Sequence, residues 1–463
     1  MAEESKAFHS GIGYTIGNIL IMGVNFLTLP IYSRILTTEE FGVYNVFVSY
    51  DSILFVIIGM ALHSSVQSAN YQFKGRIDKY VSSITLIYLI NLGLMLGAVS
   101  LFRQQLASLL DISCSAVYLL IIGSFSSAVV MLYNTRISLD YSYKKYLLVS
   151  ACSSVSNVVA SLIMIFTVFR EDRIMGRIIG TVVPLFVLAL FLLLSFYRKA
   201  KPAISKVFWQ FGVKYSLPII PHGISQVLLS QCDRIMINGI CGNAAAGIYS
   251  LAGNIKLVLS IVTDSIATAW NTWFFAKMSK GQTVEIQKRA TQIMGLVLIL
   301  SIGLMAISPE IILILGGEAY DMAKYVAIPM VMDGFILFLY NLVVTAEYYT
   351  QKTTYVMLGT MVVAVLNVVL NYIFISCYGY FAAAYTTLVS YVCYLLLHVV
   401  ISRRLAHFYV VPIRNLLIAC ALVGLSAILD LFFVNQMLLR WALCLLVIIP
   451  IGLVLCREVL KKN

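Results

Sequence analysis

The chain has 463 residues, of which 61% are hydrophobic and only 11% are charged, with a formal net charge of +12. A soluble domain is roughly 45–50% apolar and about 25% charged, so these few charged side chains could not cover a water-facing surface. The composition therefore excludes a soluble globular protein and predicts an all-α integral membrane protein, because the apolar stretches lack the period-2 alternation of barrel strands.

Apolar segments of about 20 residues predict about fourteen transmembrane helices. Residues 353–401 contain one ionisable side chain, His398, and are long enough for two spans with a turn at residues 377–380. In chain order the predicted spans are 11–36, 42–70, 80–104, 114–139, 146–169, 175–197, 214–240, 246–276, 291–315, 325–349, 355–376, 380–402, 412–433 and 437–456. The first apolar segment is too long for the core of a signal peptide, so we expect no cleavable signal.

The basic residues predict the orientation of the chain. With the N-terminus inside, most of the 32 Lys and Arg residues fall on the inner side, including the groups at 198–214 and 277–289. This excess follows the positive-inside rule and places both termini in the cytoplasm. The net positive charge therefore reflects topology, and we predict no nucleic-acid partner.

Cysteine and histidine patterns give no support to a metal or a cofactor. The nine cysteines include no C-x-x-C pair, and the five histidines show no ligand spacing. We expect the cysteines to act as small apolar residues within the spans, and we predict no metal site and no cofactor.

The two halves of the chain contain similar segments in the same order, separated by a distance that grows steadily along the chain. Asp140 falls opposite Glu347 in this alignment. The matched tripeptides are Gly42-Val43-Tyr44 with Gly247-Ile248-Tyr249, Leu132-Tyr133-Asn134 with Leu339-Tyr340-Asn341, and Asn157-Val158-Val159 with Asn367-Val368-Val369. This order predicts an internal repeat.

Six predicted helices separate equivalent points of the repeat. Because six is even, both copies enter the membrane from the same side, and we expect a pseudo-two-fold axis along the membrane normal. The predicted organisation is a first lobe at 1–197, an amphipathic linker at 198–213, a second lobe at 214–402 and two further helices at 403–463. In such folds the substrate binds between the lobes, and rocking of one lobe against the other gives alternating access.

Few ionisable residues fall well inside the spans, where each costs roughly 2.5–3.5 kcal/mol on insertion scales. They are Asp51, Lys256, Asp264 and Asp333. Asp51 falls opposite Lys256 in the repeat, so we expect both to face the cavity, where they pair or bind a charged substrate. The alternative is local pairing within each lobe, for instance between Lys256 and Asp264.

Three further candidates lie at helix ends and breaks. Arg34 and Arg234 lie at the outer ends of their helices, as headgroup anchors or as an electropositive pair suited to phosphate. Asp233 is an alternative partner for Arg234. Pro218 and Pro221 predict an interrupted helix that lines the pathway, or only a first turn, and they place His222 as a polar lining residue.

Three segments of the sequence form a recognisable pattern. They are Gly17–Tyr44, ending in Pro30-Ile31-Tyr32-Ser33-Arg34; Tyr215-Ser216-Leu217-Pro218 through Asp233-Arg234 to Ala246-Gly247-Ile248-Tyr249; and Leu366-Asn367-Val368-Val369-Leu370-Asn371 through Tyr378-Gly379 to Thr386-Thr387. These segments resemble the polysaccharide-transporter flippases of the multidrug/oligosaccharidyl-lipid/polysaccharide export superfamily. With the repeat, they cover most of the chain up to about residue 402.

This resemblance implies a bacterial cytoplasmic-membrane protein with two six-helix lobes. It implies transfer of an oligosaccharide on an undecaprenyl-pyrophosphate carrier from the inner to the outer leaflet, for O-antigen, capsule or exopolysaccharide export. Membrane lipids are the other implied partner. In the cationic cavity of this family, Lys256 is the best match inside the spans, with Arg34 and Arg234 at the rim.

Two other transporters and an enzyme are the alternatives. A cation-coupled drug or metabolite exporter of the same superfamily would resemble chains with a carboxylate in the first helix, and residues 11–33 contain none. A lipid II flippase would have more arginine in helices 1, 2 and 8. A membrane glycosyltransferase or polymerase needs a larger outer loop than this chain offers. The sugar unit, the coupling ion and the oligomeric state stay open.

Overall fold

A computed structural model of the chain describes residues 17, 23, 24 and 26–460, and this part of the protein contains helices and no strands. Residues 26–35 are helical, whereas most of the predicted first span, 11–36, lies outside the described residues. The predicted all-helical architecture is therefore confirmed for the part of the chain that the structure describes.

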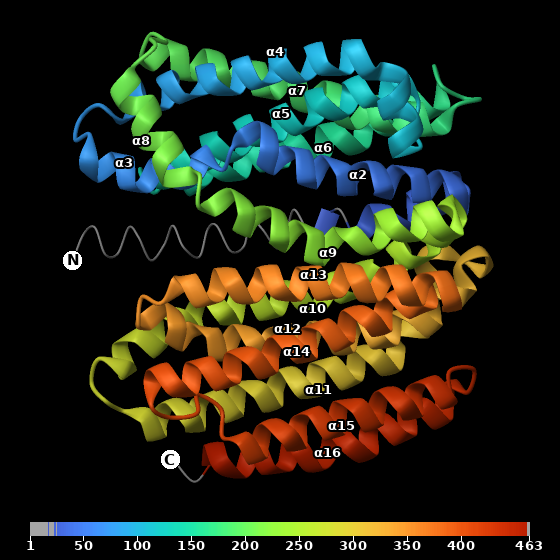
Figure 1. Ribbon diagram of the computed structural model, residues 1–463. Helices are drawn as coiled ribbons and strands as arrows, with labels where there is room; N and C mark the ends of the chain where they lie inside the picture. The colour runs from blue at the N-terminus through green and yellow to red at the C-terminus, as the bar shows by residue number, and fades with distance from the viewer. Residues whose placement is uncertain (1–16, 18–22, 25, 461–463) are drawn as a thin grey trace. The chain divides into compact units, whose positions relative to one another are not determined.

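The chain forms two compact units, Met1–Ile235 and Met236–Asn463, and the division falls within α9 (Figure 1). The first unit contains α2 (Thr38–Gly59), η1 (Leu62–Ser65), α3 (Val66–Gln72), α4 (Ile77–Leu110), α5 (Cys114–Ser138), α6 (Tyr143–Phe166), α7 (Arg173–Lys199), α8 (Lys206–Ser216) and most of α9 (Ile219–Cys241). The second contains α10 (Asn243–Met278), α11 (Thr283–Gly316), η2 (Glu318–Ala323), α12 (Lys324–Tyr349), α13 (Thr353–Tyr378), α14 (Phe381–Ala406), α15 (Ile413–Phe432) and α16 (Met437–Leu460).

The same packing pattern occurs in both units. In the first unit α7 packs on α5 and α6, and α5 packs on α2 and α4. In the second unit α14 packs on α12 and α13, and α12 packs on α10 and α11. Each helix of the first set has its counterpart in the second in the same chain order, which is the arrangement that the internal repeat predicts.

Twelve helices among the described residues are long and apolar enough to cross a membrane. Each of them overlaps one of the predicted spans. The remaining two predicted spans are 11–36, discussed above, and 214–240, which corresponds to the 23-residue helix α9. Polar residues along the whole length of α9, including Gln226, Gln231 and the Asp233-Arg234 pair, lower its hydropathy, and it is absent from the twelve.

The predicted span at 42–70 ends earlier than its apolar pattern indicates. Helix α2 stops at Gly59 because Met60 and Ala61 take left-handed backbone angles, with φ of 44° and 49°. Such angles terminate an α-helix. The chain then forms η1 and α3, and the buried Tyr80 hydroxyl hydrogen-bonds Ser65 at 2.6 Å, which holds this turn against α4.

The predicted amphipathic linker contains helix α8, which packs on the first unit. Its aromatic face covers Phe73 and Tyr80, with ring centroids of Phe208 at 4.9 Å and 5.7 Å. The indole nitrogen of Trp209 donates to the Ser83 carbonyl at 3.0 Å. The amphipathic helix that follows α7 thus packs against the core of the first unit.

Helices α15 and α16 run side by side along α11 in the second unit (Figure 1). The anchor is Arg440 of α16, whose side chain is fully buried. Its guanidinium donates to the carbonyl of Ala306 at 2.6 Å, to the carbonyl of Val434 and to the carboxylate of Glu310. Arg440 therefore ties α16 and the turn after α15 to α11.

Candidate functional site

Asp51 lies midway along α2 and faces α5. The Ser124 hydroxyl donates to Asp51 Oδ1 at 2.6 Å, and Gly123 of α5 lies beside the same carboxylate. Asp51 also lines a cavity of about 350 Å³ within the first unit. The other lining residues are Ser52, Phe55, Val56, Ala61, His63, Ser64, Ile219, Gly223 and Val227. A carboxylate that was predicted to lie within the membrane thus lines a partly polar cavity.

The break before α9 forms one wall of this cavity. Helix α8 ends at Ser216, the chain turns at residues 217–218, and α9 begins at Ile219 with Pro221 in its first turn. Proline tolerates a first turn because its missing N–H has no intrahelical partner there. Gly223 then approaches Val56 of α2. His222 is half-buried and is not among the residues that line the cavity.

Lys256 of α10 pairs with Asp333 of α12, which is 2% exposed. The ammonium also lies 5.0 Å from the ring centroid of Tyr391 on α14. Gly334 gives the lysine stem its room, with a Cβ position 3.4 Å from Lys256 Cγ. Local pairing within the second unit is therefore the observed arrangement, although the partner is Asp333 and not Asp264.

The remaining predicted residues lie at more exposed positions. Asp264 is exposed on α10, and Arg34 is exposed on the first helix. Arg234 is half-buried and donates to Gln231 Oε1 at 2.9 Å, and the same oxygen accepts from Ser49 at 3.2 Å. Arg234 is therefore joined through Gln231 to α2.

Arg177 of α7 forms a buried polar cluster that sequence reasoning missed. Its guanidinium is 8% exposed and donates to Asn157 Oδ1 at 2.9 Å and Ser161 Oγ at 2.7 Å. It also stacks over Tyr32 and Tyr44, with the guanidinium carbon 3.7 Å and 4.5 Å from the ring centroids. Hydrogen bonding and cation–π contacts stabilise a buried arginine. Through these contacts Arg177 connects α7 with α6, with α2 and with the helix at residues 26–35.

The matching helices of the second unit hold a neutral cluster. Asn367 of α13 donates to Thr387 of α14 at 3.0 Å, and Asn371 donates to Asn367 Oδ1 at 3.2 Å. Thr386 donates to Asn371 Oδ1. The sequence repeat aligns Asn367 with Asn157 and so singled this residue out. Nothing in the sequence indicated its hydrogen-bond partners.

A second buried network in the same unit surrounds Glu347. Its Oε1 lies 2.7 Å from Nδ1 of His398 and accepts from the Ser402 hydroxyl at 3.0 Å. Glu347 and His398 are both 0% exposed. Sequence reasoning placed Glu347 at the end of a span and gave it no role.

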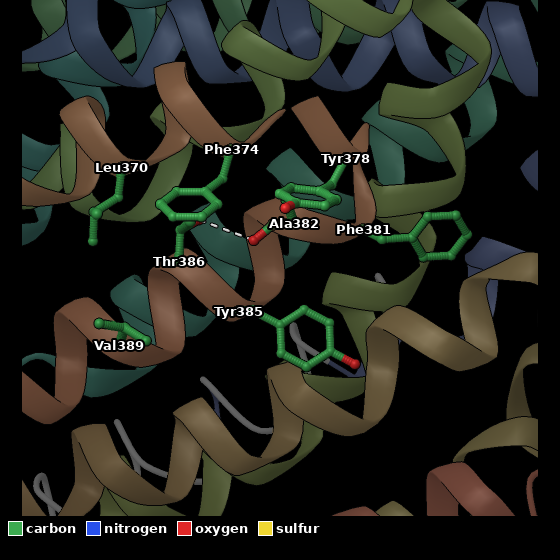
Figure 2. Close-up of a pocket in the computed structure, with 8 residues that line it drawn as sticks. All are labelled: Leu370, Phe374, Tyr378, Phe381, Ala382, Tyr385, Thr386 and Val389. Carbon is green, nitrogen blue, oxygen red and sulfur yellow. Dashed lines mark hydrogen bonds between the residues drawn. The ribbon is translucent and has the colours of Figure 1, made fainter. Parts of the chain in front are cut away.

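An aromatic groove lies between the C-terminal half of α13 and the N-terminal half of α14. It has a volume of about 460 Å³. Its lining residues are Leu370, Phe374, Tyr378, Phe381, Ala382, Tyr385, Thr386 and Val389. Figure 2 shows the Phe374 and Tyr378 rings extending from α13 towards α14, where Thr386 donates to the Ala382 carbonyl at 3.1 Å.

Metal binding has no support from the described residues. Among residues 17, 23, 24 and 26–460, no group of three or more His, Cys, Asp or Glu side chains is positioned to hold a metal ion.

Comparison with known proteins identifies the family. Residues 9–278 match the family described as "polysaccharide biosynthesis protein", and residues 218–373 match the MatE family. A Haemophilus influenzae protein described as "Lsg locus putative protein 1" is 23% identical over 358 residues, covering 74% of this chain and 83% of that protein. An uncharacterised membrane protein of the same organism is 22% identical over 352 residues, covering 73% and 83%.

Solved structures show the same fold at low identity. The lipid II flippase MurJ in an inward closed conformation has a TM-score of 0.76 with 14% identity, covering 97% of this chain and 100% of that chain. An inward-facing multidrug resistance MATE transporter has a TM-score of 0.66 with 14% identity, covering 85% and 98%. Because the family match spans more than half of the residues, this chain belongs to the polysaccharide biosynthesis protein family, as a multi-pass membrane transporter of the multidrug/oligosaccharidyl-lipid/polysaccharide export superfamily and not an enzyme.

Proposed function

We propose that this protein flips oligosaccharide repeat units on an undecaprenyl-pyrophosphate carrier from the inner to the outer leaflet of the bacterial cytoplasmic membrane. The match of residues 9–278 to the polysaccharide biosynthesis family carries the proposal. The product would be O-antigen, capsule or exopolysaccharide. The proposed topology has both termini in the cytoplasm, in agreement with the excess of Lys and Arg at 198–214 and 277–289.

The Asp51 cavity supports a sugar-binding role in the first unit. A carboxylate accepts hydrogen bonds only, and sugar hydroxyls are donors that it can bind. Ser52 and Ser64 add hydroxyls to the same wall, and Phe55 offers an aromatic face. Polar groups that converge in a largely apolar cavity are typical of small-molecule sites.

Lys256 supports a role in binding the charged carrier. Its ammonium is held by Asp333 and by Tyr391, and its side chain is still 21% exposed. A lysine ammonium binds phosphate as a point charge. We propose that Arg34 and Arg234 receive the pyrophosphate at the outer end, and that Asp264 and His222 line the path.

The test is leaflet transfer in proteoliposomes that contain the full-length protein and a fluorescent undecaprenyl-pyrophosphate-linked oligosaccharide. A membrane-impermeant quencher reports the outer-leaflet fraction with time. We expect transfer by the wild type and a slower rate for Asp51→Asn and Lys256→Gln. Asp321→Asn, which removes an exposed carboxylate paired with Lys324, is the matched control and should transfer at the wild-type rate.

A drug or metabolite exporter is the second candidate, and the MatE match at residues 218–373 favours it. The aromatic groove of Figure 2 offers the kind of surface that an apolar cation contacts. The same proteoliposomes separate the candidates: efflux of a cationic dye with no lipid transfer would overturn the flippase proposal. Transfer of lipid II but not of the lipid-linked oligosaccharide would favour the other flippase activity.

A further inference from the structure

The Glu347 network is fully buried within the second unit. Glu347 on α12 and His398 on α14 are both 0% exposed, and Nδ1 and Oε1 are 2.7 Å apart. Glu347 Oε2 and His398 Nε2 have no hydrogen-bond partner among the described residues. Buried polar atoms are nearly always paired, so two orphaned atoms on one titratable pair call for a functional explanation.

The surroundings of His398 are shaped to hold the imidazole in one place. Its ring makes edge contacts with Tyr340 and Tyr394, with centroids at 5.1 Å and 4.8 Å. A Cβ at Gly359 would come within 3.0 Å of Cε1 and closer still to Nε2, so only glycine leaves room for the ring. The hydroxyl of Tyr394 donates to Tyr340 at 2.7 Å and hydrogen-bonds Thr360 at 2.6 Å. Three helices therefore fix the histidine beside the carboxylate.

The other titratable groups around α12 are either tyrosine hydroxyls or charged side chains that are exposed or interact with residues other than Glu347 and His398. The titratable groups in electrostatic range of Glu347 are Tyr340 and Tyr348 of α12 and Tyr394 of α14. Helix α13 contributes Gly359 and Thr360, which carry no charge, and its N-cap Lys352, which is exposed and whose backbone N–H donates to the Glu347 carbonyl at 3.0 Å. Helices α10, α11 and α15 also pack on α12. Helix α10 contributes Trp270, Asn271 and Lys256, and Lys256 is paired with Asp333. Helix α11 contributes Glu285 and Glu310, which are paired with Lys277 and Arg440 respectively. Helix α15 contributes Asp430, which is in electrostatic range of Arg440.

The repeat shows that this pair is a special feature of the second unit. Asp140, the counterpart of Glu347 in the sequence repeat, pairs with Arg136 at 2.9 Å near the end of α5. Arginine keeps its charge at every accessible pH, whereas histidine gains and loses a proton near neutrality. The carboxylate is thus opposite a permanent cation in the first unit and opposite a titratable group in the second.

We propose that the Glu347–His398 pair is a proton-binding site that takes up and releases one proton in each transport cycle, and so couples transport to the proton gradient. This inference rests on the proposed transport function. A carboxylate beside a neutral imidazole carries a net charge of −1, and one added proton makes the pair neutral. No other atom is transferred: the proton comes from water on one side and returns to water on the other.

The burial of the pair supplies the coupling. A net charge in a closed apolar site is costly, whereas a neutral hydrogen-bonded pair is not. The protonated pair therefore stabilises the close packing of α12 on α14, and loss of the proton favours their separation and the entry of water. Because both groups are enclosed in the described packing, proton exchange requires this separation, which links protonation to conformation.

Infrared difference spectroscopy tests the site without any substrate. Purified full-length protein is titrated between about pH 5 and 8, the range in which histidine pairs change charge. We expect a change in the carboxyl and imidazole bands on acidification that is absent in Glu347→Gln and persists in Ser402→Ala. Ser402→Ala removes the hydrogen bond to Glu347 but leaves both titratable groups. A spectrum in which Glu347→Gln removes no pH-dependent band overturns the proposal.

Transport in proteoliposomes tests the coupling. If one proton moves in each cycle, a gradient of one pH unit changes the equilibrium constant for transport by up to about ten-fold. We expect the wild type and Ser402→Ala to respond to the gradient, and Glu347→Gln and His398→Gln to lose the response. An unchanged response in both variants overturns the proposal. If no lipid is transferred at any pH but the infrared band titrates as expected, the proton site stands and the proposed substrate is wrong.

Discussion

Gly180 of α7 offers a sharp test of the packing in the first unit. A Cβ at this position would lie 2.8 Å from Ser161 Oγ, 2.5 Å from the backbone nitrogen of Ser161 and closer still to its Cα. Because the obstruction is the backbone of α6 and not the end of a flexible side chain, Gly180→Ala must push the two helices apart. The Arg177 cluster lies less than one turn away and shares Ser161, so it is disturbed as well.

The magnitude follows from two costs. Overpacking a well-packed core costs typically 1–3 kcal/mol. Each hydrogen bond to a charged group contributes about 1.5–3 kcal/mol, so even partial loss of the Arg177 bonds adds to this. We expect a total of about 3 kcal/mol. For a unit of 150–250 residues each kcal/mol lowers the unfolding midpoint by about 2–4 °C, which gives a fall of roughly 6–12 °C.

The assay is the thermal unfolding midpoint of purified protein in detergent, compared at one heating rate because membrane proteins often unfold irreversibly. Gly97→Ala in α4 is the matched control, because a Cβ there meets nothing within 4 Å. The same substitution should be neutral or slightly stabilising at Gly97, since alanine favours helix by up to about 1 kcal/mol. Equal midpoints for Gly180→Ala and Gly97→Ala would refute the close approach of α6 and α7.

Three further substitutions probe the buried charges. Lys256→Ala removes the cation that pairs with the buried Asp333 carboxylate, so the free energy of unfolding should fall by about 3–5 kcal/mol. Adding Asp333→Asn should restore most of this loss, which a double-mutant cycle measured by thermal unfolding would show. Arg177→Lys keeps the charge but loses the planar stacking, so its midpoint should fall by several degrees while its helical circular dichroism stays unchanged. Arg440→Met should release α16 from α11, seen as faster maleimide labelling of the half-buried Cys444, and an unchanged labelling rate would contradict the anchoring role.

Much of the fold could be predicted because a helix that crosses the lipid bilayer needs a continuous run of apolar residues. Apolar runs of about 20 residues mark spans, and the repeated tripeptides correctly matched α5 with α12 and α6 with α13. The end of α2 could not be predicted, since Met60 and Ala61 are ordinary helix formers and only tertiary context gives them left-handed angles. The apolar pattern at 42–70 continues through this turn and hides it.

The candidate site was predictable only where charge stands alone in an apolar run. Asp51 and Lys256 were found in this way, but the Asp333 partner of Lys256 lies two helices further along the chain, beyond the reach of spacing rules. Arg177 lies close to the end of its span and therefore resembles a loop residue in the sequence. Glu347 and His398 are 51 positions apart, so their pairing depends on how α12 packs on α14.

The repeat retains an asparagine in α6 and α13 but changes what the asparagine binds. Asn157 Oδ1 accepts from Arg177 at 2.9 Å, a charge-assisted bond, whereas Asn367 donates to the neutral hydroxyl of Thr387 at 3.0 Å. Charge-assisted hydrogen bonds are roughly twice as strong as neutral ones. The α6–α7 contact should therefore open less often than the α13–α14 contact. We expect slower amide hydrogen exchange around Asn157 than around Asn367, and Arg177→Lys should reduce this difference, because exchange of buried amides reports local opening.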